Sequence, residues 1–228
     1  GKPNNEVFLE LGKAYFYGGE FELSNKMFEK YIALAKPIAE ELIEVETFQK
    51  NIEFSKEAMK HPINVTFKNL GREVNSEYNE LHPFITDKED NIMFTTDRKG
   101  CRGDMPDMDG FFTDIAISKV KKGRDKFSKS RSLSGSFSTE NIERVAGGSP
   151  NGYYFIYASD DQMNMQLKMS YKAPGKRSYP SSKYISSVNT RNYSELAATI
   201  TNDGNLMIFS SDMPGGFGGM DLWITRRR

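Results

Sequence analysis

The sequence predicts a multi-domain protein of the α-then-β class, with a short helical segment followed by a β domain built from repeats. Over the first sixty residues, apolar side chains recur at three- and four-residue spacings, the period of an amphipathic helix. Further along, the segment from Glu195 to Asp221 has an altered copy that begins 115 residues earlier, at Glu80. A repeated unit of strand, turn, strand and Gly-rich loop builds its core by stacking copies, as propellers and solenoids do.

Residues 1–62 are expected to form the helical segment. Gly18-Gly19 interrupts the helical spacing and predicts a turn between the first two helices. The apolar positions are Phe8, Leu11 and Tyr15 before that turn, and Phe21, Met27, Phe28 and Tyr31 after it. Pro37 suits the first turn of a third helix, whose apolar residues lie on one face up to His61-Pro62.

Residues 73–228 are expected to form about three four-stranded blades of an incomplete β-propeller, after a linker at 63–72. An apolar run that ends in a small residue and Asp occurs three times, in copies 63 and 52 residues apart. That spacing fits blades of about 40–50 residues with loop insertions. The third strand of each copy is predicted at Asp114–Ser118, Gln166–Ser170 and Asp221–Thr225.

We expect the chain to be part of a longer protein. It begins with Gly1 rather than Met, and it stops at Arg226-Arg227-Arg228, just after a third strand. Three blades are also too few to close a ring. Targeting information would therefore be missing from this stretch rather than absent from the protein.

The repeated polar and glycine residues have a structural interpretation. Asp97, Asp160 and Asp212 each end an apolar strand, where a carboxylate can accept hydrogen bonds from turn N–H groups. The glycines between Gly215 and Gly219 permit positive φ in a tight loop. That loop lacks the Lys-Ser/Thr pair and the following helix of a phosphate loop, so phosphate cradling there is excluded.

The first copy departs from the pattern, with a longer loop at Lys99–Gly110. Its carboxylates at Asp104, Asp107 and Asp109 are the candidate ligands for a hard cation such as calcium. The spacing is not that of an EF-hand, and a solvated acidic loop is the alternative. No metal or other cofactor is therefore assigned to the chain.

Charge is uneven, although 31 basic and 31 acidic residues cancel overall. Lys119–Arg131 holds seven basic residues and one acid, and no acid occurs from Gln162 to Ser194. Such a face could attract an acidic protein, lipopolysaccharide phosphates or nucleic acid, or could be a solvated face. Nucleic acid is disfavoured because aromatics are not interleaved with the lysines. The candidate partner-binding residues are Lys121, Lys122, Arg124 and Lys126.

Catalytic templates are missing from the sequence. His61 and His82 are too few for a multi-His zinc site, and no Gly-x-Ser-x-Gly elbow occurs. Cys101 is a lone cysteine without a disulfide partner. No apolar run is long enough to cross a bilayer. A non-catalytic protein without a membrane span in this stretch is expected.

Both parts resemble known families. Leu11-Gly12, Tyr15, Gly19, Phe28 and Pro37 are spaced as in a tetratricopeptide repeat. Glu80–Thr86 and Met93–Arg98 resemble the WD-like repeat of TolB-type periplasmic β-propellers. Phe209–Trp223 is a closer match and resembles the version of that repeat common in Bacteroidetes outer-membrane proteins. There, a tetratricopeptide segment and a propeller often precede an OmpA-like peptidoglycan-binding domain, as in the PorE-type component of type IX secretion.

The resemblance implies a periplasmic, outer-membrane-associated scaffold that binds other envelope proteins through helices and blades. A peptidoglycan-binding domain would then belong to the full-length chain. Two alternatives stay open. One is a propeller that gates a separate hydrolase of the prolyl-oligopeptidase type, and the other is a propeller that binds a small ligand.

Overall fold

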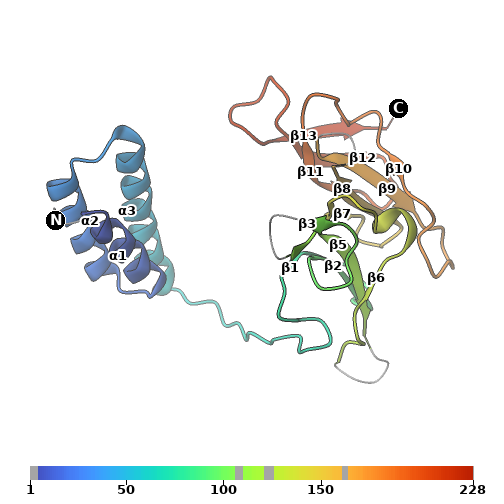
Figure 1. The fold of residues 1–228 in the computed structure, drawn as a ribbon, viewed down its shortest axis with the longest axis horizontal. Coiled ribbons are helices and arrows are strands. Elements are labelled where there is room, and N and C mark those ends of the chain that lie inside the picture. The colour runs from blue at the N-terminus through green and yellow to red at the C-terminus, as the bar shows by residue number, and fades with distance from the viewer. Residues whose placement is uncertain (1–4, 106–109, 121–125, 161–163, 228) are drawn as a thin grey trace. The chain divides into compact units, whose positions relative to one another are not determined.

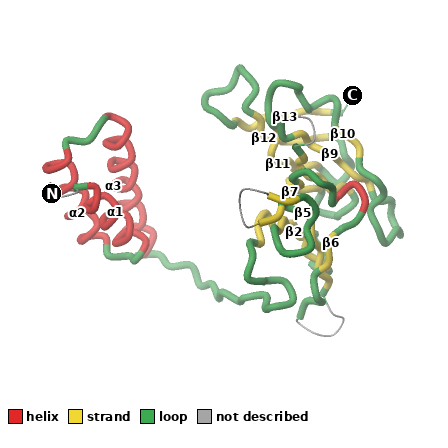
Figure 2. Tube along the Cα trace, in the orientation of Figure 1, coloured by secondary structure: helices red, strands yellow, loops and turns green. Residues whose placement is uncertain are grey.

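A computed structural model describes residues 5–105, 110–120, 126–160 and 164–227, and the chain divides into two compact units, Gly1–Phe67 and Lys68–Arg228 (Figure 1). Figure 2 shows α-helices only in the first unit and strands only in the second; a short 3-10 helix, η1 (Gly135–Phe137), interrupts the strands. The predicted fold class is therefore confirmed: α, then part of a β-propeller. None of the described helices is long and apolar enough to cross a membrane.

The helical unit is an α-hairpin with a third helix packed on it. Its helices are α1 (Glu6–Tyr17), α2 (Phe21–Ala35) and α3 (Ala39–Met59). Phe28 is fully buried, and its ring lies where a side chain at Gly12 would be, because a Cβ there would be 2.5 Å from a ring carbon. The Ser24 hydroxyl donates to the Gly12 carbonyl at 2.7 Å. The absence of a side chain at Gly12 thus sets how closely α1 approaches α2.

Replacing Gly12 with Ala should lower the stability of the helical unit by about 1–3 kcal/mol, because Phe28 or a helix must move. Thermal unfolding followed by circular dichroism at 222 nm measures the change. Gly18→Ala is the matched control, since its Cβ would meet nothing closer than 3.4 Å and its φ is −79°. Equal melting temperatures for the two variants would contradict the close-approach role of Gly12.

Besides a two-stranded sheet of β3 (Asp104–Met105) and β4 (Gly110–Phe111), the described part of the second unit contains three larger antiparallel sheets that follow one another along the chain. Their spatial orders are β1-β2-β5-β6, β7-β8-β9-β10 and β11-β12-β13. The strands are β1 (Glu80–Ile85), β2 (Asn91–Thr96), β5 (Asp114–Lys119), β6 (Arg131–Ser132), β7 (Glu143–Gly148), β8 (Tyr154–Ser159), β9 (Gln166–Tyr171), β10 (Lys183–Tyr184), β11 (Glu195–Ile200), β12 (Leu206–Ser211) and β13 (Asp221–Arg226). We call these sheets blades 1, 2 and 3. The described part of blade 3 has three strands, and the predicted third strands are β5, β9 and β13.

The blades stack through the two faces of their middle strands. On β8, Phe155 and Tyr157 belong to the core shared with blade 1, whereas Ile156 and Ala158 belong to the core shared with blade 3. All four side chains are fully buried. Alternate residues of a strand point to opposite faces, so a strand that is apolar on both faces must be covered on both. Blade 2 is therefore the central layer of the three.

Each blade starts with the same irregularity. The register between the first and second strands shifts between Leu81 and Phe84, between Val145 and Gly147, and between Glu195 and Ala198. A β-bulge strengthens the local twist, which suits the innermost strand of a propeller blade. At Gly147, φ is +141° and a Cβ would lie 2.2 Å from the Ala198 carbonyl oxygen, so only glycine fits.

The recurring aspartates close each blade in the same way. Each accepts a hydrogen bond from the backbone N–H that lies 18 residues earlier, just before the first strand. The three bonds run from Asn79 to Asp97 at 2.9 Å, from Ile142 to Asp160 at 2.8 Å and from Ser194 to Asp212 at 2.7 Å. The structural interpretation of these aspartates is confirmed, and the accepted N–H belongs to the entry of the blade.

A glutamate at the first position of each blade completes this corner. Glu80, Glu143 and Glu195 accept from the backbone N–H and the hydroxyl of Ser76, Thr139 and Thr190, respectively. Glu143 and Glu195 are fully buried. Buried carboxylates are tolerated only when hydrogen bonds replace their water, and these contacts supply them.

The glutamates also join one blade to the next. Gln166, the first residue of β9, donates its Nε2 to Glu195 of blade 3 at 3.1 Å. At the blade 1–blade 2 junction, the equivalent residue is Asp114, which is fully buried and has one oxygen, Oδ1, without a hydrogen-bond partner among the described residues. Burial, together with the neighbouring Asp114 carboxyl, raises the pKa of Glu143 to about 7. Two carboxyl groups thus occupy the place that an amide and a carboxylate share elsewhere.

The raised Glu143 pKa makes stability depend on pH. The folded protein binds this proton more tightly than the unfolded chain, whose glutamate titrates near 4.5. The contribution is therefore complete below about pH 4.5 and is lost as pH rises through about 7. Asp114→Asn keeps the shape and supplies an N–H toward Glu143. We expect its melting temperature to fall less between pH 5 and 8 than that of the parent protein, and parallel curves would contradict the carboxyl pairing.

Candidate functional site

Of the three carboxylates that the sequence predicts as candidate cation ligands, only Asp104 lies among the described residues. Asp104 lies on β3 (Asp104–Met105), which pairs with β4 (Gly110–Phe111), so the predicted loop contains a small hairpin. Asp107 and Asp109 lie outside the described residues. Among the residues that the structure describes, no group of three or more His, Cys, Asp or Glu side chains could hold a metal.

The predicted partner-binding residues are placed only in part. Lys121, Lys122 and Arg124 lie outside the described residues, whereas Lys126 is described and exposed. It precedes Phe127, which forms a bridge with Val120. A role of these four residues in partner binding stays a prediction.

His82 and Cys101 have structural partners. His82 lies in the bulge of blade 1 with φ +49°, and its Nδ1 lies 3.2 Å from the Thr95 hydroxyl. Burial lowers the pKa of His82, as does the charge of Arg144. The buried Cys101 thiol donates to the Thr96 carbonyl at 3.2 Å, and burial raises its pKa to about 11. A thiol that stays protonated at neutral pH is a poor nucleophile.

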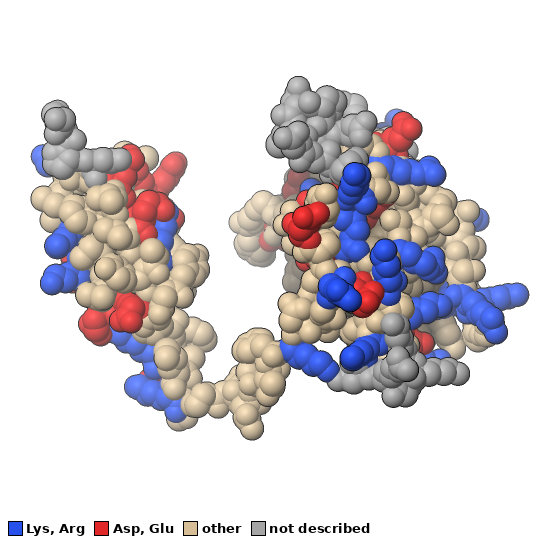
Figure 3. All heavy atoms as spheres, turned by 60° about the horizontal axis from the view of Figure 1, so that its bottom comes forward, with Lys and Arg blue, Asp and Glu red and all other residues tan. Residues whose placement is uncertain are grey.

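The charged feature with defined geometry is a groove between blades 1 and 2, with a volume of about 360 Å³. One wall comes from the end of β5 and from β6, and the other from the loop between β9 and β10. We call it the basic groove. Its cationic side chains are Lys119, Arg131, Lys172, Lys176 and Arg177, and its one acidic side chain is Asp90. Figure 3 shows Lys and Arg side chains spread over one face of this unit, with few acidic ones among them.

Tyr179 anchors the β9–β10 loop that forms one wall. Its ring packs on Phe155 at 5.4 Å between centroids, and its hydroxyl donates to the Gly152 carbonyl at 2.7 Å. The Lys172 ammonium lies 4.4 Å from the centre of the Tyr179 ring. Burial raises the pKa of Tyr179 to about 12, so the hydroxyl remains a donor. The loop is thereby held against the blade 1–blade 2 core.

Lys172 is the cationic side chain of the groove whose pKa responds to the charges around it. Burial lowers its pKa, Asp90 raises it, and the nearby charges of Lys119 and Lys88 lower it further. Burial is the largest cause of the lowered Lys172 pKa, and the neighbouring lysine charges act in the same direction. None of the five cationic side chains forms a salt bridge with any residue that the structure describes.

The two basic stretches are visible in the sequence, but the contact between them is not. The basic run at Lys119–Arg131 contributes its two end residues to the groove, and the acid-free segment Gln162–Ser194 contributes the other three cations. The absence of acids from that segment was the available signal. The pairing depends on blade stacking, which sets residues more than forty positions apart side by side.

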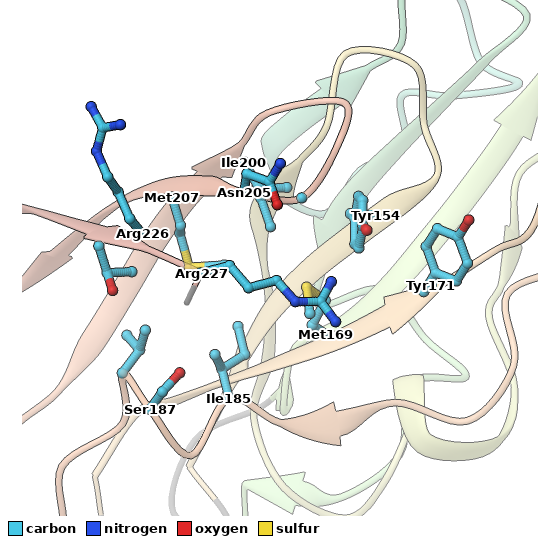
Figure 4. A pocket seen from close by; sticks show the side chains of 13 residues that line it. Tyr154, Met169, Tyr171, Ile185, Ser187, Ile200, Asn205, Met207, Arg226 and Arg227 are labelled. Carbon is cyan, nitrogen blue, oxygen red and sulfur yellow. The ribbon is translucent and has the colours of Figure 1, made fainter.

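A larger groove of about 900 Å³ lies between blades 2 and 3 (Figure 4). Its lining is mainly apolar and aromatic, and Figure 4 shows Arg227 extending across it while Arg226 points away. The residues that line it include Tyr154, Met169, Tyr171, Ile185, Val188, Ile200 and Met207. We call it the apolar groove.

The two grooves are equivalent places in the repeat. Gly204, Met207 and Arg227 of the apolar groove hold the register positions of Gly152, Phe155 and Lys172. In the basic groove, Tyr179 packs against those three residues.

Searches with protein-family models and against curated proteins find no match. Among solved structures, TolB from Acinetobacter baumannii has a TM-score of 0.39 at 14% identity, over 63% of this chain and 29% of that one. A candidate TolB from Agrobacterium tumefaciens has 0.43 at 12%, over 67% and 46%. A puromycin-hydrolyzing peptidase from Mycobacterium tuberculosis has 0.38 at 11%, over 64% and 20%. This chain thus covers less than half the length of each.

Tyr179→Phe should lower the free energy of unfolding of the second unit by about 1 kcal/mol, because the Gly152 carbonyl loses its donor. Tyr179→Ala should cost about 3–5 kcal/mol, because the ring that packs on Phe155 is also removed. Urea unfolding followed by tryptophan fluorescence measures both. Tyr171→Phe, at an exposed tyrosine of the same unit, is the control and should change little. Equal effects of Tyr179→Phe and Tyr179→Ala would refute the anchoring role of the ring.

Proposed function

We propose that this chain is a non-catalytic interaction scaffold of the bacterial cell envelope, located in the periplasm. The single observation that carries the proposal is that its repeated polar residues serve blade construction, while its distinctive chemistry lies in surface grooves. The Asp and Glu residues of all three blades are occupied by backbone and hydroxyl donors. Side chains that build every blade are not free for catalysis, whereas grooves that differ between blades offer distinct docking surfaces.

The helical unit supports a second docking surface. Large apolar side chains are exposed on its helices, with relative exposures of 75% for Phe54, 62% for Ile43 and 54% for Leu34. We propose that they form a contiguous patch, the kind of apolar surface that marks interaction sites on soluble proteins. Together with the Gly12–Phe28 packing, they support the tetratricopeptide-like assignment and a partner on the helices.

The finer assignment rests on the sequence resemblance. We propose association with the outer membrane, partners among other envelope proteins, and a PorE-type place in type IX secretion. An OmpA-like, peptidoglycan-binding domain would belong to the full-length protein. No nucleic acid and no cofactor are assigned as ligands.

Charge reversal of the basic groove tests the scaffold role. Lys176→Glu with Arg177→Glu changes two exposed groove residues, and Lys183→Glu with Arg191→Glu changes two exposed cations of the same acid-free segment outside it. The measurement is the amount of envelope partner cross-linked to the protein at 0.15 M salt, where surface attraction acts over about 8 Å. We expect the groove variant to capture at least about tenfold less of that partner than the parent protein does. The control variant should retain it. Equal retention by both variants would argue against a partner at the groove.

A further inference from the structure

We propose that the basic groove between blades 1 and 2, where β5, β6 and the β9–β10 loop meet, is a binding site for a phosphoryl group. The inference rests on the proposed interaction role and names the chemistry that the partner would present. Phosphoryl groups on a soluble ligand and on a lipid headgroup share this chemistry.

The first support is the balance of charge. Five cationic side chains face one carboxylate, Asp90, and none of the five has a salt-bridge partner among the described residues. The charges of Lys119 and Lys88 act on the half-buried Lys172 and lower its pKa, so like charges repel in this groove. A ligand with two negative charges would offset that repulsion better than a monoanion.

The second support is the kind of donors. Arg131 and Arg177 supply planar guanidinium groups, which bind phosphate oxygens through two parallel N–H donors. Lys172 and Lys176 add compact charges, and Ser134 adds a hydroxyl at the same groove. This combination is suited to an oxyanion with several acceptor oxygens.

The third support is that the groove is held in place. The β9–β10 loop carries Lys172, Lys176 and Arg177, and the Tyr179 ring and hydroxyl attach that loop to Phe155 and Gly152. The opposite wall is part of a sheet, since Arg131 pairs with Ile117 across β5 and β6. Cations on fixed backbone lose little entropy on binding an anion. The volume of about 360 Å³ suits a phosphorylated group rather than a nucleic-acid duplex.

The equivalent groove between blades 2 and 3 provides an internal contrast. It has arginines at its mouth, but its walls are the aromatic and aliphatic side chains of Tyr154, Met169 and Ile185. Among the described residues, the cluster of five cations is therefore confined to the groove between blades 1 and 2.

Isothermal titration of the whole chain with inorganic pyrophosphate, in EDTA and at constant ionic strength, tests the site. Binding should be saturable, and Lys172→Gln with Arg177→Gln should weaken it at least about tenfold, since two charge-assisted contacts are removed. Lys183→Gln with Arg191→Gln, outside the groove, should leave the dissociation constant unchanged. Circular dichroism checks that both variants remain folded.

Citrate and chloride, each added as its sodium salt at the same ionic strength, are the competing anions. Equal affinity for citrate would overturn the phosphoryl assignment, and binding that the groove variant retains would overturn the site. Sedimentation with phosphatidylglycerol vesicles separates the two sources: vesicle binding that pyrophosphate displaces indicates a headgroup, and pyrophosphate binding without it indicates a soluble ligand. Partner capture without pyrophosphate binding would reject this inference and leave the scaffold role standing.

Discussion

The hydrogen bond from the entry of each blade to the aspartate after its second strand is the interaction on which the second unit depends. It spans 18 residues in every blade, and it joins the start of the innermost strand to the end of its neighbour. The glutamate beside it accepts hydrogen bonds from a Ser or Thr hydroxyl, which replace water where the glutamate is buried. A closed corner then leaves the two faces of each sheet free to stack.

Stacking turns these corners into junctions between blades. The junction between blades 2 and 3 is an amide and a carboxylate, Gln166 and Glu195, whereas that between blades 1 and 2 is the carboxyl pair Asp114 and Glu143. Burial raises the pKa of the glutamate at both junctions, so both link stability to pH, and the Asp114 carboxyl raises the pKa of Glu143 further. Repeat proteins distribute stability over neighbouring interfaces, so a single junction can be tuned without changing the fold.

The grooves follow the same logic on the opposite edge of the blades. Phe155 and Tyr179 pack together between blades 1 and 2 and hold a basic loop there, whereas Met207 lines an apolar groove between blades 2 and 3. Function in such a scaffold is expected where equivalent positions differ, because the shared residues are committed to the architecture. The helical unit adds exposed apolar side chains of a different character. Two kinds of surface are thus available to partners.

The sequence by itself determined the order of helices and strands, the number of blade copies and the turn role of Asp97, Asp160 and Asp212. Those features depend on local periodicity and on turn chemistry within about twenty residues. Only the tertiary structure decided that Lys119 and Lys172 share a groove, and that Asp114 meets Glu143. Blade stacking sets which side chains face each other across a junction, and no local pattern encodes that contact. The candidate residues at 121–126 were therefore near the basic groove in sequence, while the decisive partners came from the next blade.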